Sequence, residues 1–260
     1  MSQPTKTPKG GESGTSKPRK GRRPQASDLR AAKDELYRRH ILAVAESVFA
    51  EQGFASTKMQ DIARSAGISL GTLYQSYASK RELHRSVLIA RDTEMFEAVM
   101  QKGQAVLQQP ESIERLLWLQ RTHLEFMLEH PDYLRMQLHE GYVWYHDAAW
   151  PSSEEQQLWI RGLDVIEQVF DWGRRQELFV PGTARDDARL LMVMQQTRLA
   201  NWMMDEMRES HETVIGRVLA DFVRQFCRPD VAAGMLSADG AALSPAAQER
   251  LGAIDQKLGA

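Results

Sequence analysis

The chain has a single cysteine, Cys227, among its 260 residues. One thiol excludes an intramolecular disulfide, and no set of metal-ligating residues contains it, so we expect neither a metal nor another cofactor. The sequence also lacks any run of 18 apolar residues, which predicts no membrane-spanning helix and no membrane partner. Its basic N-terminus has no apolar segment behind it and is therefore not a signal peptide. Together these absences favour a cytoplasmic protein.

Catalytic signatures are absent from the sequence as well. It contains no nucleophile elbow, no phosphate-binding glycine-rich loop and no H-E-x-x-H motif. Cys227 stands in an amphipathic helical pattern, with no neighbour in the sequence that would activate its thiol. An enzymatic body with a basic accessory end therefore has no support, and we expect that the protein is not an enzyme.

Charge is unevenly distributed along the chain. Residues 1–33 carry nine lysines and arginines against two acidic residues, a charge of +7, while the whole chain carries −2 and the remainder therefore −9. A basic end on an acidic body suggests a polyanionic partner for that end. Because this segment is rich in Gly, Pro, Ser and Thr and nearly free of large apolar residues, we expect a disordered basic tail.

From Asp34 onward, apolar residues recur at three- and four-residue spacing, which predicts helices, whereas alternating strand patterns are missing. Gly53 is expected to end the first helix. Thr57–Gln60 and Ser79–Glu82 have the pattern of capping boxes that open the second and fourth helices. Proline and glycine breakers divide the rest, so the sequence predicts an all-α protein of about nine or ten helices. Residues 229–260, rich in Ala and Gly, are expected to form a C-terminal tail with one loose helix.

The segment from Thr57 to Lys80 has the sequence TKMQDIARSAGISLGTLYQSYASK. Two short helical patterns, MQDIARSA and LGTLYQSY, are joined by a turn at residues 67–69. Two helices joined by a turn of three or four residues that contains Gly form a helix-turn-helix unit, which we place at residues 58–77. In such units the second helix enters the major groove, so the pattern favours double-stranded DNA as a partner.

Residues 35–95 resemble the TetR-type DNA-binding domain, with the family's residues in order and at the expected spacing. The residues that carry the resemblance are Phe49, Gly53, Phe54, Thr57, Ile62, Ala63, Ala66, Gly67, Ile68, Ser69, Gly71, Thr72, Leu73, Tyr74, Tyr77, Ser79 and Lys80. It implies a three-helix helix-turn-helix domain at residues 34–95. A helical-bundle domain for ligand binding and dimerisation would follow at residues 96–228.

Core and contact residues can be separated within this stretch. Ile62, Ile68 and Leu73 are expected in the core, and Gly67 allows a backbone conformation that a side chain would oppose. The resemblance and the polar character of several positions make ten residues candidates for DNA contact: Thr57, Lys58, Ser69, Leu70, Gly71, Thr72, Tyr74, Gln75, Tyr77 and Lys80.

Several of these assignments have an alternative. Thr57 either meets a phosphate or only caps the second helix, and Tyr74 either contacts a phosphate or packs in the core with its hydroxyl in water. Gln75, where the family often has histidine, carries an amide that can read adenine through two hydrogen bonds. The tail segment 17–24 resembles an arm that enters the minor groove, and generic phosphate neutralisation is its other interpretation.

The acidic helical remainder is rich in aromatic and methionine side chains. Ordinary helix packing explains any one of them, but together they allow an apolar pocket between helices, where ligands bind in helical bundles. His123, among them, is interpreted as a surface or hydrogen-bonded histidine. The residues assigned to the pocket are Trp118, Phe126, Met127, Tyr133, Met136, Trp144, Trp159 and Phe170.

Two apolar stripes, at residues 190–198 and 214–226, are expected by resemblance to pair with their copies in a homodimer, and a monomer with both helices internal is the alternative. A two-fold dimer places two recognition helices about 34 Å or more apart on one face of DNA. The resemblance thus implies a homodimeric repressor that a small apolar or amphipathic effector releases from a palindromic operator. A ligand-independent DNA-binding or architectural protein is the alternative function.

Overall fold

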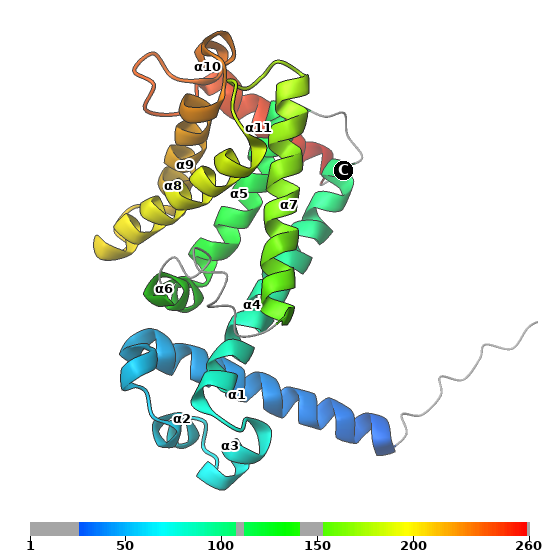
Figure 1. Cartoon of the computed structure of the whole chain (residues 1–260), viewed down its shortest axis with the longest axis vertical. Coiled ribbons are helices and arrows are strands. Elements are labelled where there is room, and N and C mark those ends of the chain that lie inside the picture. The colour runs from blue at the N-terminus through cyan, green and yellow to red at the C-terminus, as the bar shows by residue number, and fades with distance from the viewer. Residues whose placement is uncertain (1–25, 108–111, 141–152, 259–260) are drawn as a thin grey trace, which may run out of the picture. The chain divides into compact units, whose positions relative to one another are not determined.

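The structure, a computed structural model, describes residues 26–107, 112–140 and 153–258, with side chains described for 33–106, 112–139, 157, 160 and 162–256. These ranges contain eleven helices and no strand (Figure 1), which confirms the all-α class and exceeds the nine or ten helices expected. None of these helices combines the length and apolar content that a bilayer crossing needs. The helices are α1 (Ala26–Ser56), α2 (Met59–Ser65), α3 (Leu70–Ser76), α4 (Lys80–Leu107), α5 (Ile113–Glu129), α6 (Pro131–Glu140), α7 (Ser153–Arg175), α8 (Ala184–Met204), α9 (His211–Phe226), α10 (Pro229–Met235) and α11 (Pro245–Leu258).

Helix α1 begins at Ala26, whereas the sequence pattern predicted a start at Asp34 after a disordered tail. The segment ASDLRAAK consists mainly of residues with high helix propensity, so the helix extends into the expected tail without needing an apolar face. The chain divides after Arg39 into two units, and the first contains this beginning of α1. The rest of the expected tail, including the arm-like segment 17–24, lies outside the described residues.

In the second unit, the remainder of α1 packs with α2, α3 and the beginning of α4. Gly53 has a φ of +72°, which residues other than glycine rarely adopt, and it kinks α1 where the first helix was expected to end. The shared core contains the predicted Ile62 and Leu73, and Ile68 packs partly buried against it. The other buried apolar residues of this core are Ile41, Ala45, Phe49, Leu83 and Val87.

The later helices of this unit form the body, in which α7 packs along α8 and α9 lies against both α5 and α8. Phe170 of α7 packs against Phe179, Phe222 and Phe226, with ring centroids 4.8 to 6.0 Å apart. Because Phe179 follows α7 and the other two rings belong to α9, this cluster joins the end of α7 to the C-terminal half of α9.

The C-terminal region, expected to be a tail with one loose helix, has two helices within the described residues 229–258. They are α10 and α11, and α11 packs on α5, where Asp255 accepts a hydrogen bond from Trp118 Nε1 at 2.6 Å. Low overall hydropathy hides a real apolar stripe, since the last three buried residues of this region recur at spacings of four and three. The buried apolar residues are Met235, Leu243, Ala247, Leu251 and Ile254.

Candidate nucleic-acid interface

The turn between α2 and α3 fixes the direction of α3 (Figure 1). Gly67 has a φ of +66°, and no atom lies within 4 Å of the place where a Cβ would be, so backbone conformation rather than space requires the glycine. The Ile68 amide donates to Ala63 O at 3.0 Å. Ser69 caps α3, because its Oγ accepts a hydrogen bond from the Thr72 amide at 3.0 Å.

Helix α3 has one buried face and one open face. Leu73 is fully buried, and Leu70 packs partly against the same core. On the open side, the Tyr74 side chain is 47% exposed, so its alternative placement in the core does not hold. The predicted contact residues that are exposed or half-buried at this surface are Lys58, Ser69, Leu70, Gly71, Thr72, Tyr74 and Gln75.

Thr57 and Tyr77 lie inside the unit. Thr57 is 2% exposed and its hydroxyl donates to Gly53 O at 2.8 Å. The N-cap of α2 is Lys58, whose side chain makes no capping bond, so the predicted capping box at Thr57–Gln60 is wrong. Tyr77 is 3% exposed and belongs to the core. Neither side chain can meet a phosphate unless the unit opens.

Lys80 is engaged with the end of α1. Its Nζ lies 2.6 Å from Phe54 O, 3.2 Å from Ala55 O and 2.8 Å from Thr57 O, and 4.5 Å from the centroid of the Phe54 ring. An ammonium group has three protons, so the three carbonyls account for all of them. Lys80 thus connects the start of α4 to the end of α1. This structural role was not part of its prediction as a DNA-contact residue.

The predicted capping box at the start of α4 is confirmed with one change. Ser79 Oγ accepts a hydrogen bond from the Glu82 amide at 3.1 Å. The Glu82 carboxylate accepts from the amide of Ala78 at 2.7 Å, one residue before the expected position. The box fixes the start of α4 directly behind α3.

Two neighbouring residues of α4 connect the helix-turn-helix unit with the body. Arg91 Nε donates to the buried Glu46 carboxylate of α1 at 2.8 Å. Asp92 accepts hydrogen bonds from the Tyr133 hydroxyl and from Gln137 Nε2, both on α6. Burial, reinforced by the Asp92 charge, raises the pKa of Tyr133 well above its usual value, so the phenol remains a donor. A displacement of α6 therefore acts on α4 one residue away from its bond to α1.

The residues assigned to an effector pocket do not gather into one group. Trp144 and the side chain of Trp159 lie outside the described residues. Phe126 packs on Tyr133 with ring centroids 6.4 Å apart, whereas Trp118 is bonded to α11 and Phe170 belongs to the phenylalanine cluster. The six described side chains are all buried: Trp118, Phe126, Met127, Tyr133, Met136 and Phe170.

Two polar groups lie on the face of α5 that also carries Met127. Gln120 Nε2 is buried and has no hydrogen-bond partner among the described residues, and one turn later His123 Nδ1 lies 3.2 Å from Gln195 Nε2 of α8. Because an amide nitrogen only donates, Nδ1 accepts and the ring proton sits on Nε2. Burial lowers the pKa of His123 to about 4, so the ring is neutral near pH 7.

The hydrogen-bonded interpretation of His123 is therefore confirmed, whereas Gln120 was missed. The signal that could have located both residues is their spacing of three within the apolar stripe of α5, since such positions share one face of a helix.

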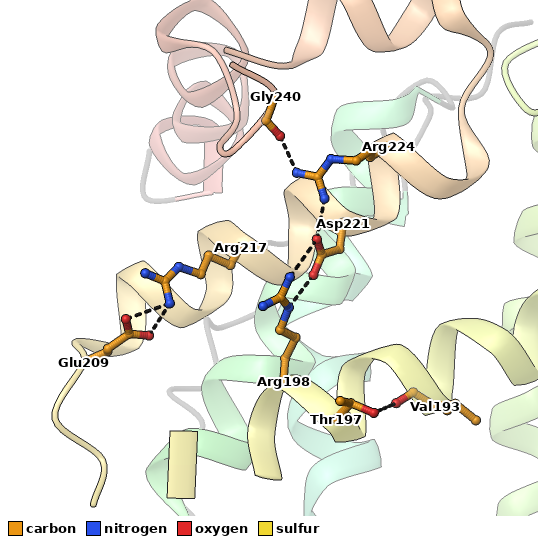
Figure 2. Close-up of polar contacts among 8 residues, drawn as sticks. All are labelled: Val193, Thr197, Arg198, Glu209, Arg217, Asp221, Arg224 and Gly240. Atoms are coloured by element: carbon orange, nitrogen blue, oxygen red, sulfur yellow. Dashed lines mark hydrogen bonds and ion pairs between the residues drawn. The ribbon is translucent and has the colours of Figure 1, made fainter. Parts of the chain in front are cut away.

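The apolar stripe of α9 at residues 214–226, predicted to face a second subunit, is buried within the chain. A neighbouring face carries charges (Figure 2), where Asp221 accepts hydrogen bonds from Arg198 at 2.5 Å and from Arg224 at 2.6 Å. Burial by itself raises the pKa of Asp221, but these two hydrogen bonds lower it, so the carboxylate stays charged. A cleft of about 210 Å³ beside this network is lined by Arg198, Asn201, Trp202, Asp205, Glu209, Val214 and Arg217.

Comparisons with known proteins agree with this geometry. The sequence model of the family described as bacterial regulatory proteins, tetR family, matches residues 41–87, which include α2, the turn and α3. The HTH-type transcriptional repressor SCO4008 of Streptomyces coelicolor is 28% identical over 174 residues, which cover 66% of this chain and 81% of that protein.

Two solved structures share the fold. The ketosteroid transcriptional regulator KstR2 of Mycobacterium tuberculosis has a TM-score of 0.60 and 21% identity, covering 74% of this chain and 95% of that chain. The transcriptional regulator FadR of Bacillus subtilis, in complex with stearoyl-CoA, has a TM-score of 0.57 and 15% identity, covering 71% of this chain and 97% of that chain.

Proposed function

We propose that this chain, a member of the TetR family, is a DNA-binding transcriptional repressor that acts in the cytoplasm as a homodimer on a palindromic operator, from which a small apolar or amphipathic effector releases it. The observation that carries the proposal is the open face of α3. A seven-residue helix is held by a capped turn and a buried leucine, and its polar side points to solvent. That arrangement suits insertion into a major groove.

The surface residues of the unit divide by chemistry into two groups. The ammonium of Lys58 and the hydroxyls of Thr72 and Tyr74 are suited to phosphate oxygens, which fix the position of the protein on the duplex. Gly71 and Gln75 lie on the part of α3 farthest from the core and are suited to the base edges. The basic segment 1–33 adds phosphate neutralisation and makes binding more dependent on salt.

Dimerisation through α8 and α9 is supported by what these helices leave uncovered. Leu190, in the first half of α8, is 39% exposed, and Met204, its last residue, is 82% exposed. Between them, α8 presents Thr197 and Arg198 to solvent. Since the apolar stripe of α9 is internal, we propose that a second copy covers the exposed side of α8 and the charged network at Asp221.

An effector site inside the body is supported by a buried donor on α5, Gln120 Nε2, which has no hydrogen-bond partner among the described residues. His123, one turn later on the same otherwise apolar face, is neutral near pH 7 and therefore offers no positive charge to a carboxylate. A molecule with a large apolar part and an uncharged oxygen acceptor would satisfy Gln120. The FadR structure of Bacillus subtilis holds stearoyl-CoA, whose acyl thioester likewise combines an apolar chain with a carbonyl oxygen.

Release follows from the bonds of α4. An effector that prefers a displaced α6 would move Asp92 through Tyr133, and the neighbouring Arg91 would transmit the shift to α1. The ligand shifts the equilibrium only by its difference in affinity for the two arrangements, typically 1–3 kcal/mol.

The test is recovery of genomic fragments by the purified chain, followed by titration of a recovered duplex with uncharged and charged apolar compounds. We expect enrichment of fragments that share a palindrome and release by an uncharged compound. Fragments that match bulk DNA would contradict the operator-specific repressor. Enriched fragments that no compound releases would favour the ligand-independent alternative.

A further inference from the structure

Helix α3 carries no charged side chain. Its seven residues are LGTLYQS, with neither an acidic nor a basic residue in the first or last turn. The commonest specific contact to guanine is a bidentate arginine or lysine. This helix has none to offer, so its base readout depends on uncharged donors and acceptors.

The geometry of the helix indicates which residue is placed to contact the base edges. Leu73 is fully buried, and Gln75 follows it by two positions, which is roughly 200° around the helix axis. Gln75 is therefore exposed on the side opposite the core. All residues of α3 are described, and among their side chains only the Gln75 amide has a donor atom and a separate acceptor atom.

Gly71 lies one turn before Gln75 on the same outward side. Among the described residues, a Cβ there would meet only Ser69 Oγ at 3.7 Å, an ordinary contact, and the backbone is not in the left-handed region. Neither packing nor conformation in the described part of the chain requires glycine, although glycine weakens a helix relative to alanine. An external surface that approaches the bare Cα closely accounts for it.

We propose that Gln75 reads the adenine of an A·T pair in each operator half-site, and that Gly71 lets α3 approach the base edges closely enough for this contact. The amide oxygen of Gln75 accepts from adenine N6–H, and the amide nitrogen donates to N7. This inference rests on the proposed binding to DNA and adds the identity of a base that the half-site must contain.

Selection from a duplex pool tests the inference without a known operator. The full chain and its Gln75→Arg and Gln75→Ala variants each select from duplexes with about 30 random base pairs, enough for two half-sites one helical turn apart. We expect adenine at one position of each half-site for the native chain. The arginine variant should replace it by guanine and leave other positions unchanged, and the alanine variant should accept any base there.

In direct titrations, changing that adenine should weaken binding of the native chain by about 5- to 150-fold and of the alanine variant far less. Selected sites that are the same for all three proteins would overturn the assignment of Gln75 while leaving DNA binding intact. A pool that the native chain does not enrich would instead overturn the proposed function, and the inference with it.

A second pair of variants tests the role of Gly71. Gly71→Ala should raise the melting temperature, as expected for a helical glycine, yet weaken binding to the selected duplex. Gly252→Ala in α11, where a Cβ has open space, is the matched control and should raise the melting temperature with DNA affinity unchanged. Equal DNA affinity of Gly71→Ala and the native chain would overturn the close approach.

Discussion

Lys80 and Lys58 lie in the same unit but have different surroundings. The Lys80 ammonium is shared among three backbone carbonyls at the end of α1, whereas Lys58 is exposed and makes no capping bond. The charge of a lysine does not by itself determine whether it binds DNA or stabilises the fold. For Lys80, the backbone carbonyls within hydrogen-bond distance indicate a stabilising role.

Lys80→Met should therefore destabilise the fold. It leaves three carbonyls without a charged donor, which costs about 1.5–3 kcal/mol of unfolding free energy, and thermal unfolding should show a fall of several degrees. Lys58→Met should leave the melting temperature unchanged and weaken binding to every duplex, with a salt dependence reduced by about one phosphate contact. A Lys80 variant that has the melting temperature of the native chain but binds DNA less well would contradict the structural role and support a direct DNA contact for Lys80.

The distance along the chain explains which residue roles were predictable. Gly67 and the Ser79–Glu82 box act within four residues, so the local sequence reveals them. Lys80 depends on a carbonyl 23 residues earlier, and the buried state of Tyr77 depends on packing between several helices. The family resemblance placed Lys80 and Tyr77 among the DNA contacts because it matches positions along the sequence and contains no information on what surrounds each side chain.

At the scale of elements, α11 is the largest departure from the sequence prediction. Its three buried apolar residues are spaced for a helix, but the charged and amide side chains around them lower the mean hydropathy, and the Ala- and Gly-rich composition suggested a tail. One of the hydrogen bonds that hold α11 on α5 joins Trp118 and Asp255, which are 137 residues apart. Periodicity found the other long helices because their apolar stripes are broader, as the eight buried apolar residues of α9 illustrate.

Asp255→Ala should measurably weaken the docking of α11 on α5. It removes the acceptor of the buried Trp118 Nε1–H and a 3.1 Å ion pair with Arg121, and an orphaned buried donor costs about 1–3 kcal/mol. Glu249→Ala, at an exposed position of the same helix, is the control and should change the unfolding free energy by less than about 0.5 kcal/mol. Urea unfolding of both variants measures the difference, and equal midpoints would show that α11 contributes no stability through Asp255.

At the scale of the whole molecule, the uneven charge and the symmetry of the proposed target would act together. The basic residues 1–33 are followed by a chain of formal charge −9, so the positive charge directly precedes the helix-turn-helix unit in the sequence. One copy of α3 has seven residues and would read few base pairs. In the proposed homodimer, two copies joined by their bodies would double these contacts and require a two-fold symmetric site.

The most direct test is the mass of the complex formed on the selected duplex, measured for the original site and for one with about five base pairs, half a helical turn, inserted between the half-sites. We predict two chains on the original duplex and loss of paired binding on the lengthened one, because its half-sites face opposite sides of the helix. A single chain per duplex, with affinity unaffected by the insertion, would contradict the paired presentation of α3.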